Sequence, residues 1–328
     1  MSSVTKAGPA VSAGPAPSPA RKRHGAGRKW MEIGLFSAPA ILVYVGFVFV
    51  PVALAAYYSF FNWNGLGPLE RFIGFDNYTR ALADPVFHTA LRNNFFVVFA
   101  SLLIQGPLAI GVALLLNRKL RGRSLIRLLI FIPYILSEVI AGVAFKLILQ
   151  APPAAGELGP FDTVLQAVGL GELRQLWLAD QSVVMWTVFA VLTWKYLGFA
   201  IIIMLAGLQG VPEELGEAAA IDGASWWQTQ RHITIPLLGP TIRVWAFLSI
   251  IGSLQLFDMV WIMTGGGPAN STHTMATYMV KYGLSSTQVG FGSAVAVILF
   301  AISLVIALFY QRFALRRDLE GSLTGREG

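Results

Sequence analysis

Three charged side chains lie in strongly apolar stretches of the sequence: Glu138, Lys195 and Asp258. A charge at the centre of a membrane helix costs about 2.5–3.5 kcal/mol on insertion scales, so it usually faces a bundle interior or a wet cavity. Two interpretations are open for Glu138 and Lys195. They form an ion pair between packed helices, or they line a pathway through which a solute passes.

Aromatic residues accompany these charges, namely Trp186, Trp194, Tyr196, Phe257 and Trp261. Aromatic faces stack on sugar rings, but interfacial belts and helix packing also use such residues. The candidate residues of a translocation cavity are Glu138, Trp194, Lys195, Tyr196, Phe257 and Asp258.

No constellation typical of an enzyme accompanies them. The four histidines are scattered over the tail and loops, without metal-ligand spacing, and no Gly-x-Ser-x-Gly elbow occurs. The glycine run at 265–267 reads as a turn, because no Gly-Lys-Ser or Gly-Lys-Thr follows anywhere. We therefore expect no enzyme activity, no ATP hydrolysis by this chain, and neither a cofactor nor a metal bound to it.

A polar stretch, residues 210–240, separates two apolar runs and predicts two short helices. Pro212 suits the first helical position, and Glu213, Glu214 and Glu217 place negative charge near the positive end of the helix dipole. Alanines after Glu217 favour helix, and Gly223 can adopt the left-handed conformation that ends one.

The second helix of this stretch begins at a capping box. Ser225 and Gln228 have the required spacing, and Pro236 and Pro240 are expected to stop the helix before the next apolar run. An ordinary loop between two membrane helices is the plain alternative for the whole stretch.

The spacing of residues in this stretch resembles the "EAA loop" of the membrane subunits of binding-protein-dependent ABC importers. Ile235 departs from the family's usual Leu but stays apolar. The resemblance extends over residues 29–316 and is strongest to the carbohydrate-uptake branch, the permeases of maltose, lactose and glycerol-phosphate type. It implies a coupling helix that docks on a cytoplasmic ATPase, with coupling residues Glu213, Glu214, Glu217, Ala218, Ala219, Asp222, Gly223, Ala224, Ile233 and Pro236.

The composition is that of a membrane protein. Of 328 residues, 55% are hydrophobic and 12% charged, against about 25% charged in soluble domains. Six segments are long and apolar enough to span a bilayer: 33–60, 94–116, 125–149, 183–208, 241–263 and 289–309. We expect an all-α integral membrane protein with six spans and kinks at Pro51, Pro107 and Pro133. The resemblance implies the type I ABC importer transmembrane fold.

The basic residues predict the orientation. With the N-terminus inside, 17 of the 24 Lys and Arg residues fall in inner segments and 5 in outer ones, so both termini and the 210–240 loop are expected in the cytoplasm. We expect a disordered tail at 1–29, a permease domain at 30–316 and a C-terminal tail at 317–328. A cleaved signal peptide is the rival interpretation of the N-terminus. The net charge of +7 reflects this topology rather than nucleic-acid binding.

The resemblance implies a permease in the cell membrane, in contact with the lipid bilayer, that passes a sugar, such as an oligosaccharide, or a related polyol. Its implied partners are a second permease subunit, two ATPase subunits that hold ATP and Mg²⁺, and an external solute-binding protein. Three alternatives stay open: an importer of a non-sugar solute such as glycerol-3-phosphate, a secondary transporter driven by an ion gradient, and a membrane enzyme.

Overall fold

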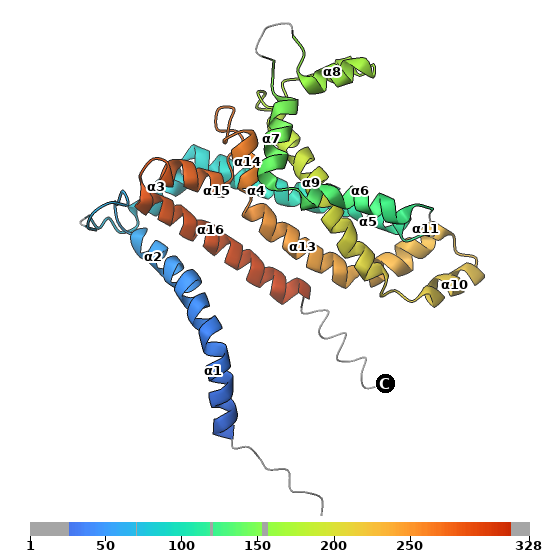
Figure 1. Ribbon diagram of the computed structural model, residues 1–328, viewed down its shortest axis with the longest axis horizontal. Helices are drawn as coiled ribbons and strands as arrows, with labels where there is room; N and C mark the ends of the chain where they lie inside the picture. Colours follow the sequence, from blue (N-terminus) through green and yellow to red (C-terminus); the bar gives the residue numbers. More distant parts are fainter. Residues whose placement is uncertain (1–25, 70, 119–120, 153–156, 316–328) are drawn as a thin grey trace, which may run out of the picture. The chain divides into compact units, whose positions relative to one another are not determined.

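The computed structural model describes residues 26–69, 71–118, 121–152 and 157–315, and these form helices joined by loops (Figure 1). Across those ranges the isolated pairing of Phe61 with Phe72 is the sole strand-like contact. The chain divides into two compact units, Met1–Pro51 and Val52–Gly328. The expected tails fall outside the described residues, apart from residues 26–29, which already belong to the first helix.

The first apolar segment is helical throughout. It comprises α1 (Ala26–Tyr44), a π-helical turn (Val45–Phe49) and α2 (Val50–Tyr58). Its described large apolar side chains are mostly exposed, which suits contact with lipid. The expected distortion at Pro51 takes the form of the π turn just before it, since proline clashes with the carbonyl four residues earlier.

A second long span, Pro85–Leu116, likewise consists of two α-helices joined by a π-helical turn. It contains α4 (Pro85–Ala100), a π turn (Ser101–Gln105) and α5 (Gly106–Leu116). Asp84 caps α4 by accepting a hydrogen bond from the backbone N–H of Val86 at 2.7 Å. Pro107 lies two residues after the end of the π turn, so the distortion expected at this proline takes the form of a π turn.

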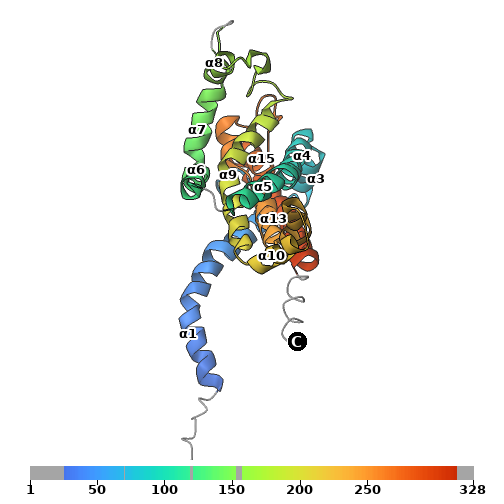
Figure 2. The ribbon, with the colours of Figure 1, turned by 90° about the vertical axis from the view of Figure 1, so that its right-hand side faces the viewer.

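Helix α9 (Val184–Leu208) is the most buried of the four long spans in the described residues. It contacts α5, α6, α13 and α14, and buried residues occur along its whole length (Figures 1 and 2). A helix that is apolar on every face is expected at such a central position. The last long span, Val289–Ala314, consists of α16 (Val289–Tyr310) and a closing π turn (Gln311–Leu315).

Two further spans are bent pairs of helices. Helix α6 (Arg123–Ile135) meets α7 (Glu138–Leu149) at 94°. The helical stretch Trp226–Leu237 meets α13 (Gly239–Leu254) at 65°. The described residues therefore hold four helices able to cross a membrane, or up to six if each bent pair is one span.

The expected third and fifth segments differ from the structure in one respect. Segment 125–149 is broken far more sharply than a proline kink, and segment 241–263 ends as a helix at Leu254. A separate short helix, α14 (Asp258–Met263), follows and packs against α7. Both breaks are stabilised by polar side chains from distant parts of the sequence, which form hydrogen bonds with the backbone groups that the breaks expose.

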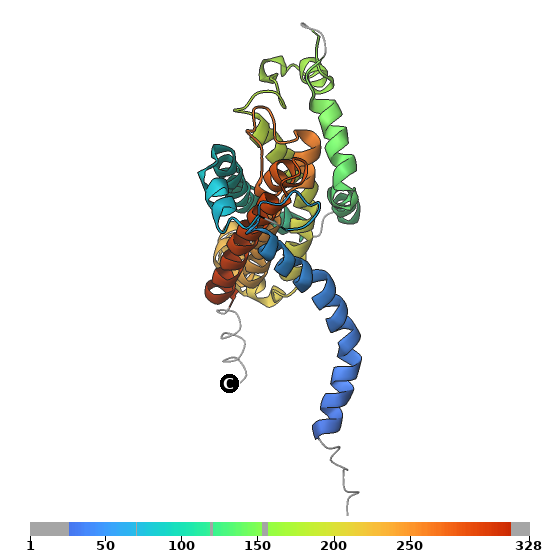
Figure 3. The same cartoon turned by 90° about the vertical axis from the view of Figure 1, so that its left-hand side faces the viewer.

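Two of the shorter helices lie at opposite ends of the second unit. Figure 2 shows α8 (Pro160–Ala167) at one end and α10 (Glu213–Ile221) at the opposite end. Helix α16, red in Figure 3, contacts α3 (Asp76–Ala83), α13 and α15 (Met275–Tyr278).

The segment between α14 and α16, residues 264–288, is packed into the protein. Asn93 donates hydrogen bonds to the carbonyls of Ser271 and His273 at 2.7 and 2.9 Å. The turn at the glycine run is present, and Gly266 has a positive φ with its Cα against the His273 ring, where a Cβ would overlap. Burial, with Lys281 nearby, lowers the pKa of His273 to about 4, so the ring is neutral at ordinary pH.

The contact between α9 and α6 generates a stability prediction. A Cβ at Gly198 would overlap the carbonyl oxygen of Ile130, whereas one at Gly111 on α5 would meet nothing. We expect Gly198→Ala to lower the free energy of unfolding by about 1–3 kcal/mol through overpacking. Thermal melting of the purified protein in detergent measures this. Gly111→Ala is the matched control, and an equal effect of both variants would contradict the close approach of α6 and α9.

Candidate functional site

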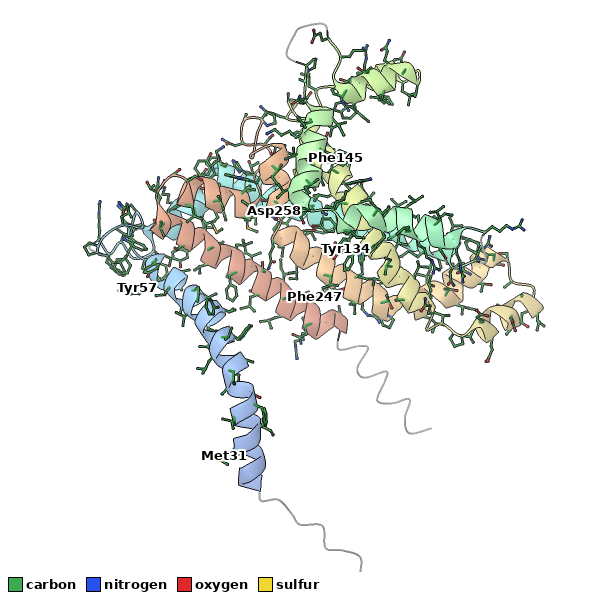
Figure 4. All side chains as sticks on the ribbon, viewed as in Figure 1. Met31, Tyr57, Tyr134, Phe145, Phe247 and Asp258 are labelled. Carbon is green, nitrogen blue, oxygen red and sulfur yellow. The ribbon has the colours of Figure 1, made fainter. Side chains whose placement is uncertain are left out.

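A cavity of about 330 Å³ opens between α4, α6, α7, α9, α13 and α14. Figure 4 labels two residues of its wall, Tyr134 on α6 and Asp258 at the start of α14. The wall combines aromatic, polar and acidic groups. Its aromatic members are Tyr134, Phe189, Tyr196, Phe199, Trp245 and Phe257, and its uncharged polar members include Ser101, Gln105, Ser249, Ser253 and Gln255.

Glu138 occupies the first position of α7, directly after the 94° break. The sequence placed it in the middle of a span, but the structure places it at a helix start, where the dipole stabilises a carboxylate. Its Oε1 accepts a hydrogen bond from the hydroxyl of Tyr196. The side chain is half-buried and forms part of the cavity wall.

Asp258 holds the equivalent position on α14, directly after the break that ends α13. Its side chain is exposed and contributes to the cavity wall. The preceding residue, Phe257, is also in the wall and stacks on Trp261 with ring centroids 5.5 Å apart. Both acidic wall residues thus begin short helices that pack against each other.

Lys195 does not line the cavity. Its side chain is 3% exposed, and its Nζ donates to the carbonyl of Leu136 at 2.6 Å and to that of Pro133 at 3.5 Å. These carbonyls lie at the end of α6, where the break leaves them without helical partners. In the described ranges Glu138 and Lys195 have these separate partners rather than a mutual ion pair.

The break at the end of α13 is stabilised in the same way. Asn94 on α4 donates to the carbonyls of Ser253 and Leu254 at 2.7 and 3.1 Å. Thr274 donates to the carbonyl of Leu256 at 2.6 Å. Unpaired carbonyls in an apolar interior are costly, so these contacts hold the helix end beside the cavity.

A polar strip lies where the π turn of the second span meets α13. Ser101 donates to Gln105 at 2.6 Å, and its hydroxyl lies 2.7 Å from that of Ser249. Π-helical turns inside α-helices are frequent at functional sites. Sequence analysis missed this strip, although polar residues within apolar segments are its signal.

Of the six expected cavity residues, the wall contains Glu138, Tyr196, Phe257 and Asp258. Trp194 is 41% exposed and packs edge-on against Phe145, so like Lys195 it lies outside the wall. The reason is helical geometry. Wall residues of α9 recur at three- and four-residue intervals, at Phe189, Leu192, Tyr196 and Phe199, and positions 194 and 195 face elsewhere.

The predicted coupling stretch forms α10 and then α11 (Trp226–Thr229). Pro212 is the N-cap of α10 rather than its first residue, a shift of one position. Gly223 adopts a φ of +80°, and Ser225 with Gln228 forms the expected capping box. Pro236 lies within α12 (Ile235–Leu237) and Pro240 near the start of α13, so the prolines mark the 65° bend.

The surface of α10 is largely open. Glu213, Glu214, Glu217, Ala218, Asp222 and Gly223 are exposed, whereas Ala219 is buried. Ile221, at the end of α10, is 86% exposed. The Arg118 guanidinium lies 4.3 Å from the centroid of the Trp226 ring and joins α11 to the end of the second span. The role of the predicted coupling residues in contact with an ATPase stays a prediction.

The pairing of Lys195 generates a second prediction. We expect Lys195→Met to destabilise the protein by about 1–3 kcal/mol, because it leaves buried carbonyls unpaired. Most of this loss should remain in the double variant Lys195→Met/Glu138→Gln, since the principal partners of Lys195 are backbone groups. Thermal melting of the two single variants and the double variant measures this. Recovery of wild-type stability in the double variant would instead indicate an ion pair.

Residues 105–318 match the family described as "binding-protein-dependent transport system inner membrane component". The chain is similar to a probable ABC transporter permease of Pyrococcus horikoshii, with 36% identity over 84% of this chain and 93% of the relative. It is 33% identical to the arabinooligosaccharides transport system permease AraP of Bacillus subtilis, over 84% of this chain and 85% of the relative.

Among solved structures, a bacterial ABC transporter involved in the import of the acidic polysaccharide alginate shares the fold. Its TM-score is 0.75 at 24% identity, covering 88% of this chain and 96% of that chain. The match with the family covers well over half of the sequence. The chain therefore belongs to the family of inner membrane components of binding-protein-dependent transport systems, and is a multi-pass membrane protein rather than an enzyme.

Proposed function

We propose that this chain is the permease subunit of an ATP-driven ABC importer and that its cavity carries a saccharide. The observation that carries the proposal is the composition of the cavity wall. The wall combines aromatic side chains with serine hydroxyls, amides and carboxylates, which suits a solute with apolar ring faces and many hydroxyl groups. The relative AraP of Bacillus subtilis, a permease for arabinooligosaccharides, supports this class of solute.

The proposed assembly follows from family membership. Its other parts are a second permease subunit, two cytoplasmic ATPase subunits that hold ATP and Mg²⁺, and an external solute-binding protein. In this assembly both termini of the chain and α10 are cytoplasmic, as the distribution of Lys and Arg indicates. The permease domain spans residues 30–316, and the chain itself binds no cofactor.

Coupling to ATP is assigned to the segment 210–240. Helix α10 has exposed acidic residues, and Ala218 leaves its surface smooth enough for close approach to a partner. The positive φ at Gly223 sets the turn between α10 and α11. The exposed Ile221 adds an apolar contact at the same end.

An uptake experiment tests the energy source and the solute class. The permease is reconstituted with its partners in liposomes, and uptake of the saccharide bound by the solute-binding protein is measured. We expect uptake to require ATP at the ATPase side and to persist when ionophores collapse ion gradients. Uptake that stops with the gradient and ignores ATP would favour a secondary transporter with Glu138 or Asp258 as relay. A binding protein specific for a non-sugar solute would overturn the saccharide assignment.

Substitutions in the coupling segment test its role separately. Glu217→Lys reverses an exposed charge, and Gly223→Val adds a left-handed backbone penalty of about 1–2 kcal/mol. We expect both to leave membrane insertion intact but to reduce co-purification of the ATPase or to uncouple hydrolysis from transport. Glu217→Ala should act more mildly, because exposed ion pairs contribute about 0–1 kcal/mol.

The matched control for these variants is Glu172→Lys, a charge reversal at an exposed position between α8 and α9. It should retain both ATPase association and coupled transport. Wild-type behaviour of Glu217→Lys and Gly223→Val in both assays would remove the coupling role from this segment.

A further inference from the structure

The charged residues of the cavity wall are both acidic. Glu138 and Asp258 are the wall's ionisable carboxyl groups, and none of its described residues is Lys, Arg or His. The remaining wall is aromatic, aliphatic or uncharged polar. A solute in this cavity therefore meets two carboxylates and no basic side chain of the described wall.

The negative charges of Glu138 and Asp258 are compensated to different extents by neighbouring groups. Lys195 is buried beside the α6–α7 break, and its Nζ donates to the carbonyl of Leu136, two residues before Glu138. Glu138 also accepts the Tyr196 hydroxyl. Asp258 has no side-chain hydrogen bond or ion pair with the described part of the chain. The positive end of the α14 helix dipole compensates at most about half an elementary charge of the Asp258 carboxylate.

Asp258 is thus the less compensated carboxylate, and it is exposed to the cavity. A second anion close to it would be repelled, and a like charge within about 4–6 Å disfavours ionisation strongly enough to shift a pKa by a unit or more. Hydroxyl or ammonium groups, in contrast, donate charge-assisted hydrogen bonds to a carboxylate.

We propose that this cavity selects by charge, with Asp258 as the discriminating residue, and that it accepts uncharged or cationic saccharides and rejects acidic ones. The inference rests on the proposed function and narrows its substrate class. Selection of this kind works through repulsion of the wrong solute as much as through attraction of the right one.

The test uses the importer assembled from both permeases and both ATPases in lipid nanodiscs. The binding protein is omitted, so that its own selectivity does not enter. Three radiolabelled probes of matched size are compared by equilibrium dialysis: cellobiose, the same disaccharide with its terminal C6 oxidised to a carboxylate, and the same disaccharide with a C2 amine. We expect wild-type protein to prefer the neutral and amino probes over the acidic one by about tenfold or more.

Asp258→Asn should remove most of that preference, by raising affinity for the acidic probe relative to the neutral and amino probes. Asp258→Glu should retain the preference, and Glu138→Gln should reduce it less, because the Glu138 carboxylate already accepts the Tyr196 hydroxyl. Glu172→Gln, outside the cavity, controls for net charge and should change nothing.

Equal wild-type affinity for the acidic and neutral probes, or an unchanged preference in Asp258→Asn, would overturn the charge selection while leaving the saccharide function intact. Binding of none of the three probes would overturn the proposed saccharide function and this inference with it.

Discussion

The arrangement of the second unit depends on pairing backbone carbonyls that broken helices expose. An apolar interior offers no water to these groups, and each unpaired one costs several kcal/mol. Lys195 pairs with the end of α6, and Asn94 and Thr274 pair with the end of α13. These three side chains allow two apolar segments to turn sharply inside the protein, where an uninterrupted helix would otherwise be the stable solution.

The chemistry of the cavity follows from these breaks. A helix that restarts inside the protein presents the positive end of its dipole, and an acidic residue at the first position is stabilised there. Glu138 and Asp258 occupy those positions on α7 and α14. The free-energy cost of placing Glu138 and Asp258 in a membrane is therefore lowered by their positions at helix starts rather than by an ion pair with Lys195.

Sequence reasoning succeeded where the signal is local and failed where it is distant. Apolar length located the four long helices of the described residues that are able to cross a membrane. The Ser225–Gln228 spacing predicted the capping box of α11, and Gly223 predicted the left-handed residue after α10. The two breaks escaped prediction because their stabilising side chains are far away in the chain; Asn94 lies 159 residues from Ser253. The prediction that Trp194 lines the cavity was wrong for another reason. Phe189, Tyr196 and Phe199 lie on the face of α9 that lines the cavity, whereas position 194 lies on a different face.

The same geometry connects the cavity with the segment 210–240. Helix α9 continues unbroken from Phe199 in the wall to Leu208, about 14 Å at 1.5 Å per residue, and α10 begins soon after. Helix α13 leaves the other end of the segment and carries Trp245 into the same wall. The two helices meet closely at Gly207, where a Cβ would overlap the hydroxyl of Thr241. A displacement of α10 would therefore act on two walls of the cavity together, and the hydrogen bonds from Lys195 to Leu136 and from Tyr196 to Glu138 would pass the motion of α9 on to the break before α7.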